Sequence, residues 1–273
     1  MTSASFPIAP VSGFIGAEVD LDLSRPVDEG ARQALNDALD RHLVLFFRGQ
    51  DLDAAGLKRV TEIFAPLVRV PYITPSLEYP DIIAVLKEAS EAKIANFGGD
   101  WHSDFSFLDE PPGGSVLYGL EIPPFGGDTI WANGGAILRG LPADLRAAID
   151  NLYVVHDFQD ALNRAGEIYP LVAHPAIRTH PETGEDIFWI NFSLKPRFVD
   201  LDKAESDALL ARLYDEVKKP EHSVRFRWRE GSVAFWDNRA GIHYAVKDYG
   251  DFPRVMHRVL IARDDVPHRV RTA

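Results

Sequence analysis

The stretch Trp101-His102-Ser103-Asp104-Phe105-Ser106-Phe107 contains the most informative pattern in this chain. His102 and Asp104 stand two positions apart, and side chains at positions i and i+2 of an extended strand point to the same side. One imidazole and one carboxylate can therefore converge on a single metal ion. His243, far downstream within Gly-Ile-His-Tyr, can supply a third ligand.

Two histidines and one carboxylate on one face of a metal ion, with the other face open, suit non-haem Fe(II) oxygenases. An isolated His-x-Asp is a weak signal because it arises often by chance. Here it lies between a loop that ends Asn-Phe-Gly-Gly and an aromatic segment, and it has a downstream partner. We therefore predict that His102, Asp104 and His243 are the metal ligands and the catalytic centre. The competing histidines are His156, His174, His180 and His222.

The composition is that of an ordinary globular chain. Of its 273 residues 46% are hydrophobic and 26% charged, without a repeat or linker, so we expect a single domain over 1–273. The net charge of −12 disfavours nucleic acid as a partner, because phosphate binding calls for basic surfaces. We see no signal peptide and no apolar run of membrane-spanning length. The absence of cysteine excludes disulfides and thiolate sites, and we expect a cytoplasmic protein.

Periodicity predicts many short strands and a few helices. Strand-like segments cover 13–20, 44–47, 82–86, 115–120, 129–132, 151–158, 187–192, 223–228, 232–236 and 255–262. Helical spacing covers 29–43, 54–64, 141–152 and 203–218. Residues 159–175 look irregular and suit a lid. This pattern indicates a mainly β fold with peripheral helices, of the jelly-roll type.

Two arginines near the C-terminus share one face of a predicted strand. Arg254, Met256 and Arg258 alternate there, so both guanidinium groups point the same way. A buried charge needs a partner. These arginines either pair with internal carboxylates or bind a dicarboxylate cosubstrate, which arginine recognises through paired hydrogen bonds. Thr129, in Gly-Gly-Asp-Thr-Ile-Trp, is either a donor to the same carboxylate or an ordinary strand residue.

Four motifs in order resemble one family. Trp-His-Ser-Asp, Gly-Gly-Asp-Thr-Ile-Trp, Trp-Asp-Asn-Arg followed by His-Tyr, and Arg-Val-Met-His-Arg are similar to the taurine dioxygenase/aryloxyalkanoate dioxygenase family. The similarity runs nearly end to end. It implies a double-stranded β-helix (jelly roll) and an oxygenase that depends on Fe(II) and 2-oxoglutarate.

The resemblance also implies a role for individual residues. The iron ligands would be His102, Asp104 and His243. Thr129 and Arg254 would bind the distal carboxylate of 2-oxoglutarate, and Arg258 would lie near the cosubstrate and the acidic group of the substrate. We predict that Phe158, Arg258, Tyr72 and His156 contact the substrate, the first because it matches an aromatic residue of the taurine enzyme's pocket.

The resemblance implies hydroxylation of a small organic anion by O2, with release of succinate and CO2. A sulfonate is favoured, but Val70 and Gly98 replace a histidine and an asparagine of the taurine pocket, so taurine itself is disfavoured. The alternatives with the same chemistry are an aryloxyalkanoate, a sulfate ester and a carboxylate-bearing biosynthetic intermediate. Outside this class stand a metal-dependent jelly-roll hydrolase or isomerase and a non-catalytic ligand-binding jelly roll. The family commonly forms homo-oligomers.

Overall fold

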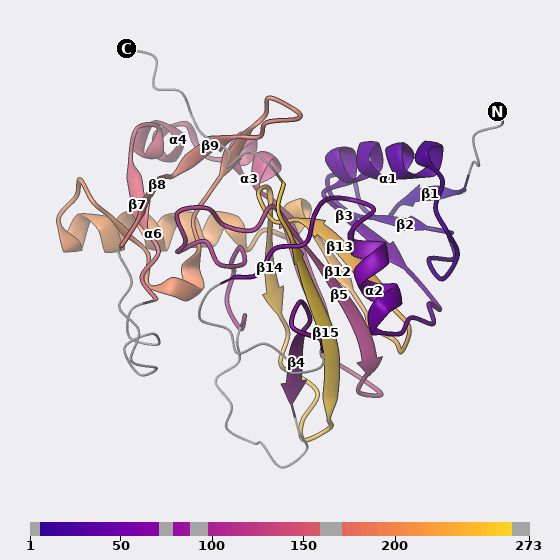
Figure 1. Cartoon of the computed structure of the whole chain (residues 1–273). Coiled ribbons are helices and arrows are strands. Elements are labelled where there is room, and N and C mark those ends of the chain that lie inside the picture. Colours follow the sequence, from indigo (N-terminus) through magenta and orange to yellow (C-terminus); the bar gives the residue numbers. More distant parts are fainter. Residues whose placement is uncertain (1–5, 71–78, 88–97, 159–170, 264–273) are drawn as a thin grey trace.

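A seven-stranded sheet forms the larger layer of the molecule (Figure 1). The computed structural model describes residues 6–70, 79–87, 98–158 and 171–263. The strand order in this sheet is β1-β2-β3-β13-β5-β15-β4, and all neighbours are antiparallel except β2 and β3. Its strands are β1 (Ile8–Pro10), β2 (Ala17–Val19), β3 (Val44–Phe47), β4 (Ile83–Lys87), β5 (Gly114–Glu121), β13 (Val233–Asp237) and β15 (Arg254–Ile261).

A three-stranded sheet of order β12-β6-β14 packs against the larger one. Its strands are β6 (Thr129–Asn133), β12 (Ser223–Phe226) and β14 (Gly241–Ala245). Trp131 of the small sheet lies with Trp236 and Met256 of the large sheet in one buried cluster. This apolar layer between two antiparallel sheets makes a β-sandwich.

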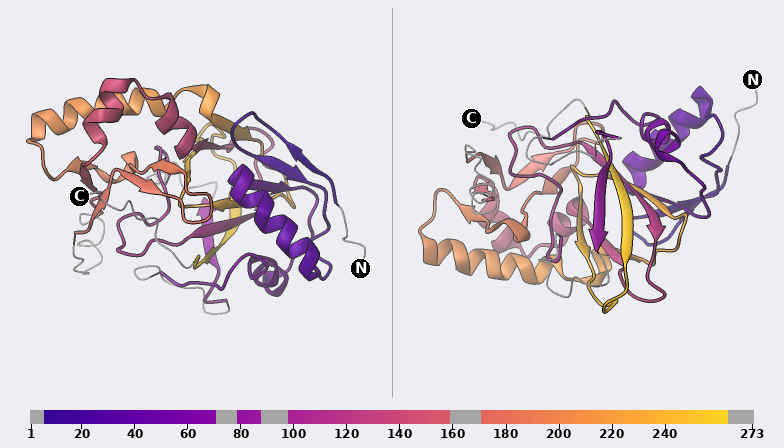
Figure 2. Two further views of the ribbon diagram at one scale, coloured as in Figure 1. Left: turned by 90° about the horizontal axis from the view of Figure 1, so that it is seen from above. Right: turned by 60° about the horizontal axis from the view of Figure 1, so that its bottom comes forward.

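Alternation along β13 builds two cores at once. Val233 and Phe235 belong to a cluster on the outer face of the large sheet, whereas Ala234 and Trp236 belong to the layer between the sheets. Helices α1 (Glu29–His42) and α2 (Ala54–Thr61) cover the outer face, as both views in Figure 2 show.

Three further helices lie on the other side of the molecule, around a third core. They are α3 (Gly134–Gly140), α4 (Ala143–Ile149) and α6 (Lys203–Val217). They pack with two small sheets, of order β11-β7-β8 and β10-β9. The strands of these sheets are β7 (Tyr153–Val155), β8 (Ala173–Pro175), β9 (Ile177–Thr179), β10 (Asp186–Phe188) and β11 (Arg197–Phe198).

Most predicted elements are present, and the differences have local causes. The helices expected over 29–43, 54–64 and 203–218 and the strands over 44–47 and 255–262 are found within a few residues. The helix expected over 141–152 begins only after Pro142, which is extended. Helix α3 was not expected because it opens with two glycines. A Cβ on Gly134 would stand 2.6 Å from Ile187, so the close packing there excludes a side chain.

The segment predicted to be an irregular lid is only partly described. Residues 159–170 lie outside the described residues, and 173–175 form strand β8 rather than irregular chain. No helix in the described ranges is long and apolar enough to cross a membrane.

Candidate active site

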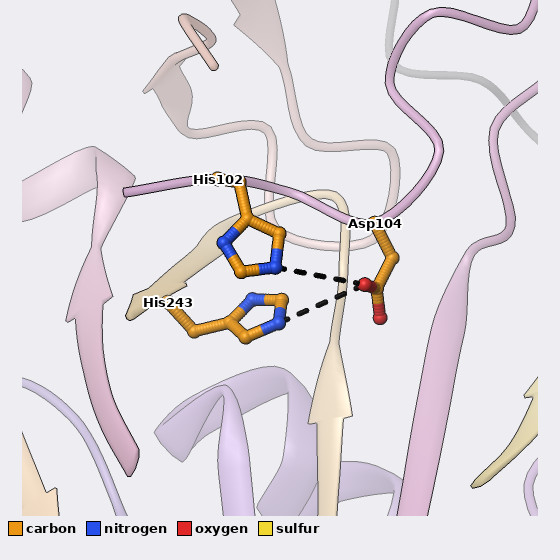
Figure 3. A group of neighbouring side chains, drawn as sticks. All are labelled: His102, Asp104 and His243. Atoms are coloured by element: carbon orange, nitrogen blue, oxygen red, sulfur yellow. Dashed lines mark ion pairs between the residues drawn. The ribbon is translucent and has the colours of Figure 1, made fainter. Parts of the chain in front are cut away.

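The two histidines of the predicted triad are paired through their backbones. The N–H of His102 donates to the carbonyl of His243 at 2.9 Å, and the N–H of His243 donates back to His102 at 2.7 Å. This reciprocal pair is an isolated antiparallel bridge that joins the loop before β5 to strand β14. The imidazole ring centroids lie 4.0 Å apart (Figure 3). Residues far apart in sequence are thus held in fixed register.

Asp104 completes the triad from a turn rather than from an extended strand. Phe105, the next residue, has a φ of 53°, so the chain bends immediately after the carboxylate. The extended segment is therefore limited to the bridge at His102 and ends at Asp104, and both side chains reach one point as expected. Asp104 Oδ1 lies 3.9 Å from His102 Nε2 and 3.7 Å from His243 Nε2 (Figure 3). The ligand atoms of all three residues lie within 4.8 Å of one another.

Asn238 clamps the main chain of Asp104. Its side-chain Oδ1 accepts from the N–H of Asp104 at 2.7 Å, and its Nδ2 donates to the carbonyl of Asp104 at 2.9 Å. The carboxylate is held as well, since Ser115 Oγ donates to Oδ2 and Arg258 donates to Oδ1. These bonds fix both the position and the rotation of the carboxylate. Partners of this kind orient metal ligands.

The three side chains are in the protonation states that bind a metal. Burial opposes ionisation of Asp104, but the Arg258 guanidinium, the two imidazoles and the Ser115 hydroxyl together outweigh burial and hold the pKa of Asp104 at about 2. Burial lowers the pKa of His102 and lowers that of His243 well below its usual value. At neutral pH one carboxylate is ionised and two imidazoles are neutral, as metal coordination requires.

The two imidazoles are held by different means. His102 Nδ1 lies 2.8 Å from the carbonyl of Asp100, which selects the tautomer that leaves Nε2 free for a metal. His243 has no hydrogen bond to either ring nitrogen within the described chain, and it packs between Trp131 and Trp236. Buried ring nitrogens without partners are costly. A metal ion would satisfy one of them, so the donor set fits a divalent ion such as Fe(II).

A cavity of about 410 Å³ opens at the triad. Arg254 lines it, is 8% exposed, and forms no ion pair with any residue in the described ranges. Burial lowers the pKa of Arg254 to about 10, so it stays charged at neutral pH. Gly127, with a φ of 67°, packs beside this side chain, where a Cβ would stand 3.4 Å from Arg254 Cδ. Asp128 attracts this guanidinium from beyond ion-pair distance, so Arg254 remains able to pair with an anionic ligand.

The two arginines of β15 therefore differ in whether they pair with an internal carboxylate. Arg258 also lines the cavity, but its NH1 donates to Asp104 Oδ1 at 2.8 Å, so it has an internal carboxylate partner. Arg254 has none among the residues described and keeps its charge for a ligand. Thr129, at the start of β6, lines the same cavity as Arg254.

An aromatic wall forms another part of the cavity. We use this name for Phe105, Phe107, Phe158 and Leu194, all of which line it. The rings of Phe107 and Phe158 stack at 4.8 Å. Phe158, predicted to contact substrate, is therefore in a position to do so. Leu194, which completes the wall, was not predicted.

The other two tentative substrate residues differ from Phe158. Tyr72 lies outside the described residues. His156 is 1% exposed and does not line the cavity, contrary to our expectation. Its Nε2 accepts from the N–H of Asn191 at 3.0 Å, and its Nδ1 lies 3.2 Å from the carbonyl of Ser106. With both nitrogens bonded inside the protein, His156 supports Asn191, which does line the cavity.

The competing histidines are also accounted for. His174 Nε2 lies 2.9 Å from the carbonyl of Leu108. His180 was expected in an exposed turn but is buried. Its Nε2 lies 3.2 Å from a carboxylate oxygen of Asp237, because the ion pair of Asp237 and Arg239 lies beneath the turn. In the described chain the triad is the one group of three such side chains close enough to share a metal.

Asn238 was missed because its partners are distant in sequence. It stands in the Trp-Asp-Asn-Arg motif, so that motif was noticed, but nothing local shows that an amide there bonds a residue 134 positions away.

The chain is similar to dioxygenases over most of its length. A sulfate ester dioxygenase from Pseudomonas putida, dependent on α-ketoglutarate (2-oxoglutarate), is 37% identical over 93% of this chain and 89% of the relative. An alkylsulfatase from Acinetobacter baylyi is 35% identical over 92% of this chain and 83% of the relative. The crystal structure of a taurine dioxygenase from Burkholderia xenovorans superimposes with a TM-score of 0.81 at 36% identity, covering 95% of this chain and 92% of that one.

These likenesses confirm the predicted jelly roll, because the solved neighbours are dioxygenases with that fold and the two packed sheets match it. The family model described as "Taurine catabolism dioxygenase TauD, TfdA family" matches residues 5–260. The chain therefore belongs to the TauD, TfdA dioxygenase family.

Proposed function

We propose that this Fe(II)- and 2-oxoglutarate-dependent dioxygenase hydroxylates an organic sulfate ester or sulfonate that carries an apolar tail. The single observation that carries the proposal is the cavity at the triad, which has an unpaired arginine on one side and the aromatic wall on another. We propose further that the protein is a single cytoplasmic domain over 1–273 that needs no nucleic acid. The homo-oligomeric state stays a prediction from the family.

The residues that would hold the cofactors follow from the site. His102, Asp104 and His243 would bind Fe(II), since they supply three converging donors in the right protonation states. Arg254 and Thr129 would bind the distal carboxylate of 2-oxoglutarate, because both line the cavity and Arg254 lacks an internal anion. When bound, the iron and 2-oxoglutarate supply the oxidising power that breaks a C–H bond.

The lining of the cavity favours an anion with an apolar tail. Asp104 is the sole acidic side chain among the described lining residues, and it belongs to the triad. Among the described lining residues a zwitterion such as taurine would find no carboxylate free of the triad for its ammonium group, and burying an unpaired charge is costly. The aromatic wall offers apolar surface to a hydrocarbon chain instead. Arg258, whose Nε is buried without a partner, adds positive charge near the triad.

The reaction balances without any further reagent. 2-Oxoglutarate and O2 are consumed in equal amounts. One oxygen atom enters succinate, formed with CO2, and the other becomes the hydroxyl group on the substrate carbon. When that carbon bears a sulfate ester, the hydroxylated product breaks its C–O bond to sulfate and yields an aldehyde. A sulfonate would lose sulfite in the same way.

The relatives support testing sulfate esters first. The relatives named alkylsulfatase and sulfate ester dioxygenase match over more than nine-tenths of this chain. The taurine dioxygenase structure keeps sulfonates as the second class. An aryloxyalkanoate or another carboxylate would fit the same cations but has less support.

The test measures succinate from the Fe(II)-loaded protein with 2-oxoglutarate and O2. The panel contains hexyl sulfate, hexanesulfonate, taurine and phenoxyacetate. We expect hexyl sulfate to raise succinate well above the substrate-free rate, with hexanal and sulfate in matching amounts. Sulfate and hexanol without succinate would show a hydrolase. Stimulation by phenoxyacetate alone would keep the oxygenase and overturn the substrate class.

A further inference from the structure

The hydroxyl group of Thr129 receives a buried hydrogen bond from a tryptophan. Trp228 Nε1 donates to Thr129 Oγ1 at 2.9 Å. Trp228 is 2% exposed and Thr129 is 3% exposed, so water does not compete for this bond. Strand pairing brings the two together, because Thr129 lies opposite Phe226, two residues before Trp228.

The hydrogen-bonding capacity of the indole and hydroxyl groups determines where the hydroxyl proton of Thr129 points. An indole N–H can only donate, whereas a threonine hydroxyl has one proton and two lone pairs. Thr129 must therefore accept from Trp228, and its own proton has to point elsewhere. No described residue accepts that proton, and Thr129 lines the same cavity as Arg254. A donor that faces a cavity beside an unpaired arginine suits a carboxylate.

Burial alone does not explain the bond. The indole N–H groups of Trp131, Trp189 and Trp236 are also buried, and in the described chain they have no hydrogen-bond partner. Trp228 is held in place by aromatic packing, with Phe226 edge-on at 5.0 Å and Trp131 at 6.3 Å. Because this packing holds the indole ring in one orientation, the N–H of Trp228 can orient the hydroxyl group of Thr129.

We propose that Trp228 is a positioning residue for the cosubstrate. It occupies a lone pair of Thr129 and thereby presents the hydroxyl proton of Thr129 to the distal carboxylate of 2-oxoglutarate. This inference rests on the proposed function, in which Thr129 and Arg254 bind that carboxylate.

The test measures the Kd of 2-oxoglutarate by calorimetry on the Mn(II)-loaded protein without O2, so that no turnover occurs. The variants are Trp228→Phe, which removes the N–H but keeps an aromatic ring, Thr129→Val, and the double variant. We expect Trp228→Phe to raise the Kd about three- to tenfold, the range for one hydrogen bond to a charged group that is weakened but not lost. The double variant should bind no more weakly than Thr129→Val, because Trp228 acts only through Thr129.

Trp189→Phe is the matched control, since it removes a buried indole N–H that has no hydrogen-bond partner among the described residues, and Trp189 is not one of the described residues that line the cavity. The Kd of Trp189→Phe for 2-oxoglutarate should equal that of the wild type. The affinity for Mn(II) alone and the Tm, measured on every variant, report any general structural damage. Trp228→Leu gives the same comparison if Trp228→Phe does not fold.

The outcomes separate the inference from the proposed function. If Thr129→Val leaves the Kd unchanged, the cosubstrate role of Thr129 is wrong and the inference falls with it. If Thr129→Val weakens binding but Trp228→Phe does not, the cosubstrate site stands and the role of Trp228 is overturned. Independent, multiplicative losses in the double variant would also overturn it.

Discussion

The two sides of the cavity are built in different ways. On the side proposed to hold the cofactors, Thr129, His243 and Arg254 stand on strands β6, β14 and β15, where ladder hydrogen bonds fix their backbones. On the side proposed to hold the substrate, Phe105, Phe158 and Leu194 belong to turns, loops and a short 3-10 helix. The comparison teaches that the common chemistry is carried by the sheets, whereas the part that selects the substrate is carried by connections that can vary.

The supports behind the two sides also differ. Behind the triad, side-chain hydrogen bonds from Asn238, Ser115 and Arg258 reach Asp104. Behind the aromatic wall the main support is packing, with the Asn191–His156 bond beneath it. Changes on the cofactor side should therefore remove metal or cosubstrate binding, and changes on the substrate side should alter substrate preference.

The largest effect should come from His102→Ala. It removes one of three ligands, so the affinity for Fe(II) or Mn(II) should fall by more than the roughly 100-fold that loss of a supporting partner causes. Substrate-dependent succinate should vanish. Equilibrium dialysis measures the metal, with His222→Ala as a control outside the site. Unchanged metal affinity and turnover would remove His102 from the ligand set.

Arg254→Met should weaken the binding of 2-oxoglutarate more than the binding of the metal. Removing one partner of a buried charge pair costs about 2 kcal/mol or more, or roughly 30-fold in Kd. Calorimetry on the Mn(II) form measures both constants. Arg197→Met removes an exposed charge and is the control. If both variants bind 2-oxoglutarate equally, the distal carboxylate lies elsewhere.

Asn238→Ala should lower metal affinity by about 10- to 100-fold, the usual effect of a lost supporting partner. The main-chain N–H and carbonyl of Asp104 would lose their side-chain bonds. Asn36→Ala, on the exposed face of α1, is the control. A normal metal affinity with a lowered Tm would limit Asn238 to folding.

Phe158→Ala should change the binding of substrate and leave the binding of metal and 2-oxoglutarate unchanged. The KM for a long alkyl sulfate should rise about tenfold, since burying an aromatic side chain contributes roughly 1.5–3 kcal/mol. Methyl sulfate, which cannot reach the wall, should show little change. Succinate rates across a chain-length series measure this. An equal rise for every chain length would mean that the wall does not contact the tail.

The smallest effect concerns the support beneath the wall. Burial lowers the pKa of His156 to about 3, while the unfolded chain titrates near 6.5. Acid therefore protonates the unfolded state first, so stability present at neutral pH is lost as the pH falls below about 6.5. Between pH 7 and pH 5.5 the loss should be about 1 kcal/mol. Urea unfolding should show a loss of stability over this pH range that is smaller in His156→Gln than in the wild type by about 1 kcal/mol, because His102 and His243 also have lowered pKa values and contribute to the slope in both proteins; equal losses would contradict the prediction.

The order of the motifs was enough to predict the jelly roll, which is confirmed, and the three predicted ligands do lie together. Residue type alone left Arg254 between an internal ion pair and a bound carboxylate, and its cosubstrate role stays a prediction from the resemblance. The remainder depends on the folded chain. The Asn238 clamp joins Asp104 across 134 positions, and the Trp228–Thr129 bond spans 99. The inward position of His156 was not predictable either, because its partners come from two other loops.

The most direct measurement is the rate of succinate formation over a grid of 2-oxoglutarate and hexyl sulfate concentrations, for wild type, Arg254→Lys and Phe158→Leu. These milder variants keep charge and apolar bulk, so turnover stays measurable. We predict that Arg254→Lys raises the KM for 2-oxoglutarate and leaves that for hexyl sulfate, and that Phe158→Leu does the reverse. If each variant shifts both constants together, the cavity is not divided into a strand-borne cofactor side and a loop-borne substrate side.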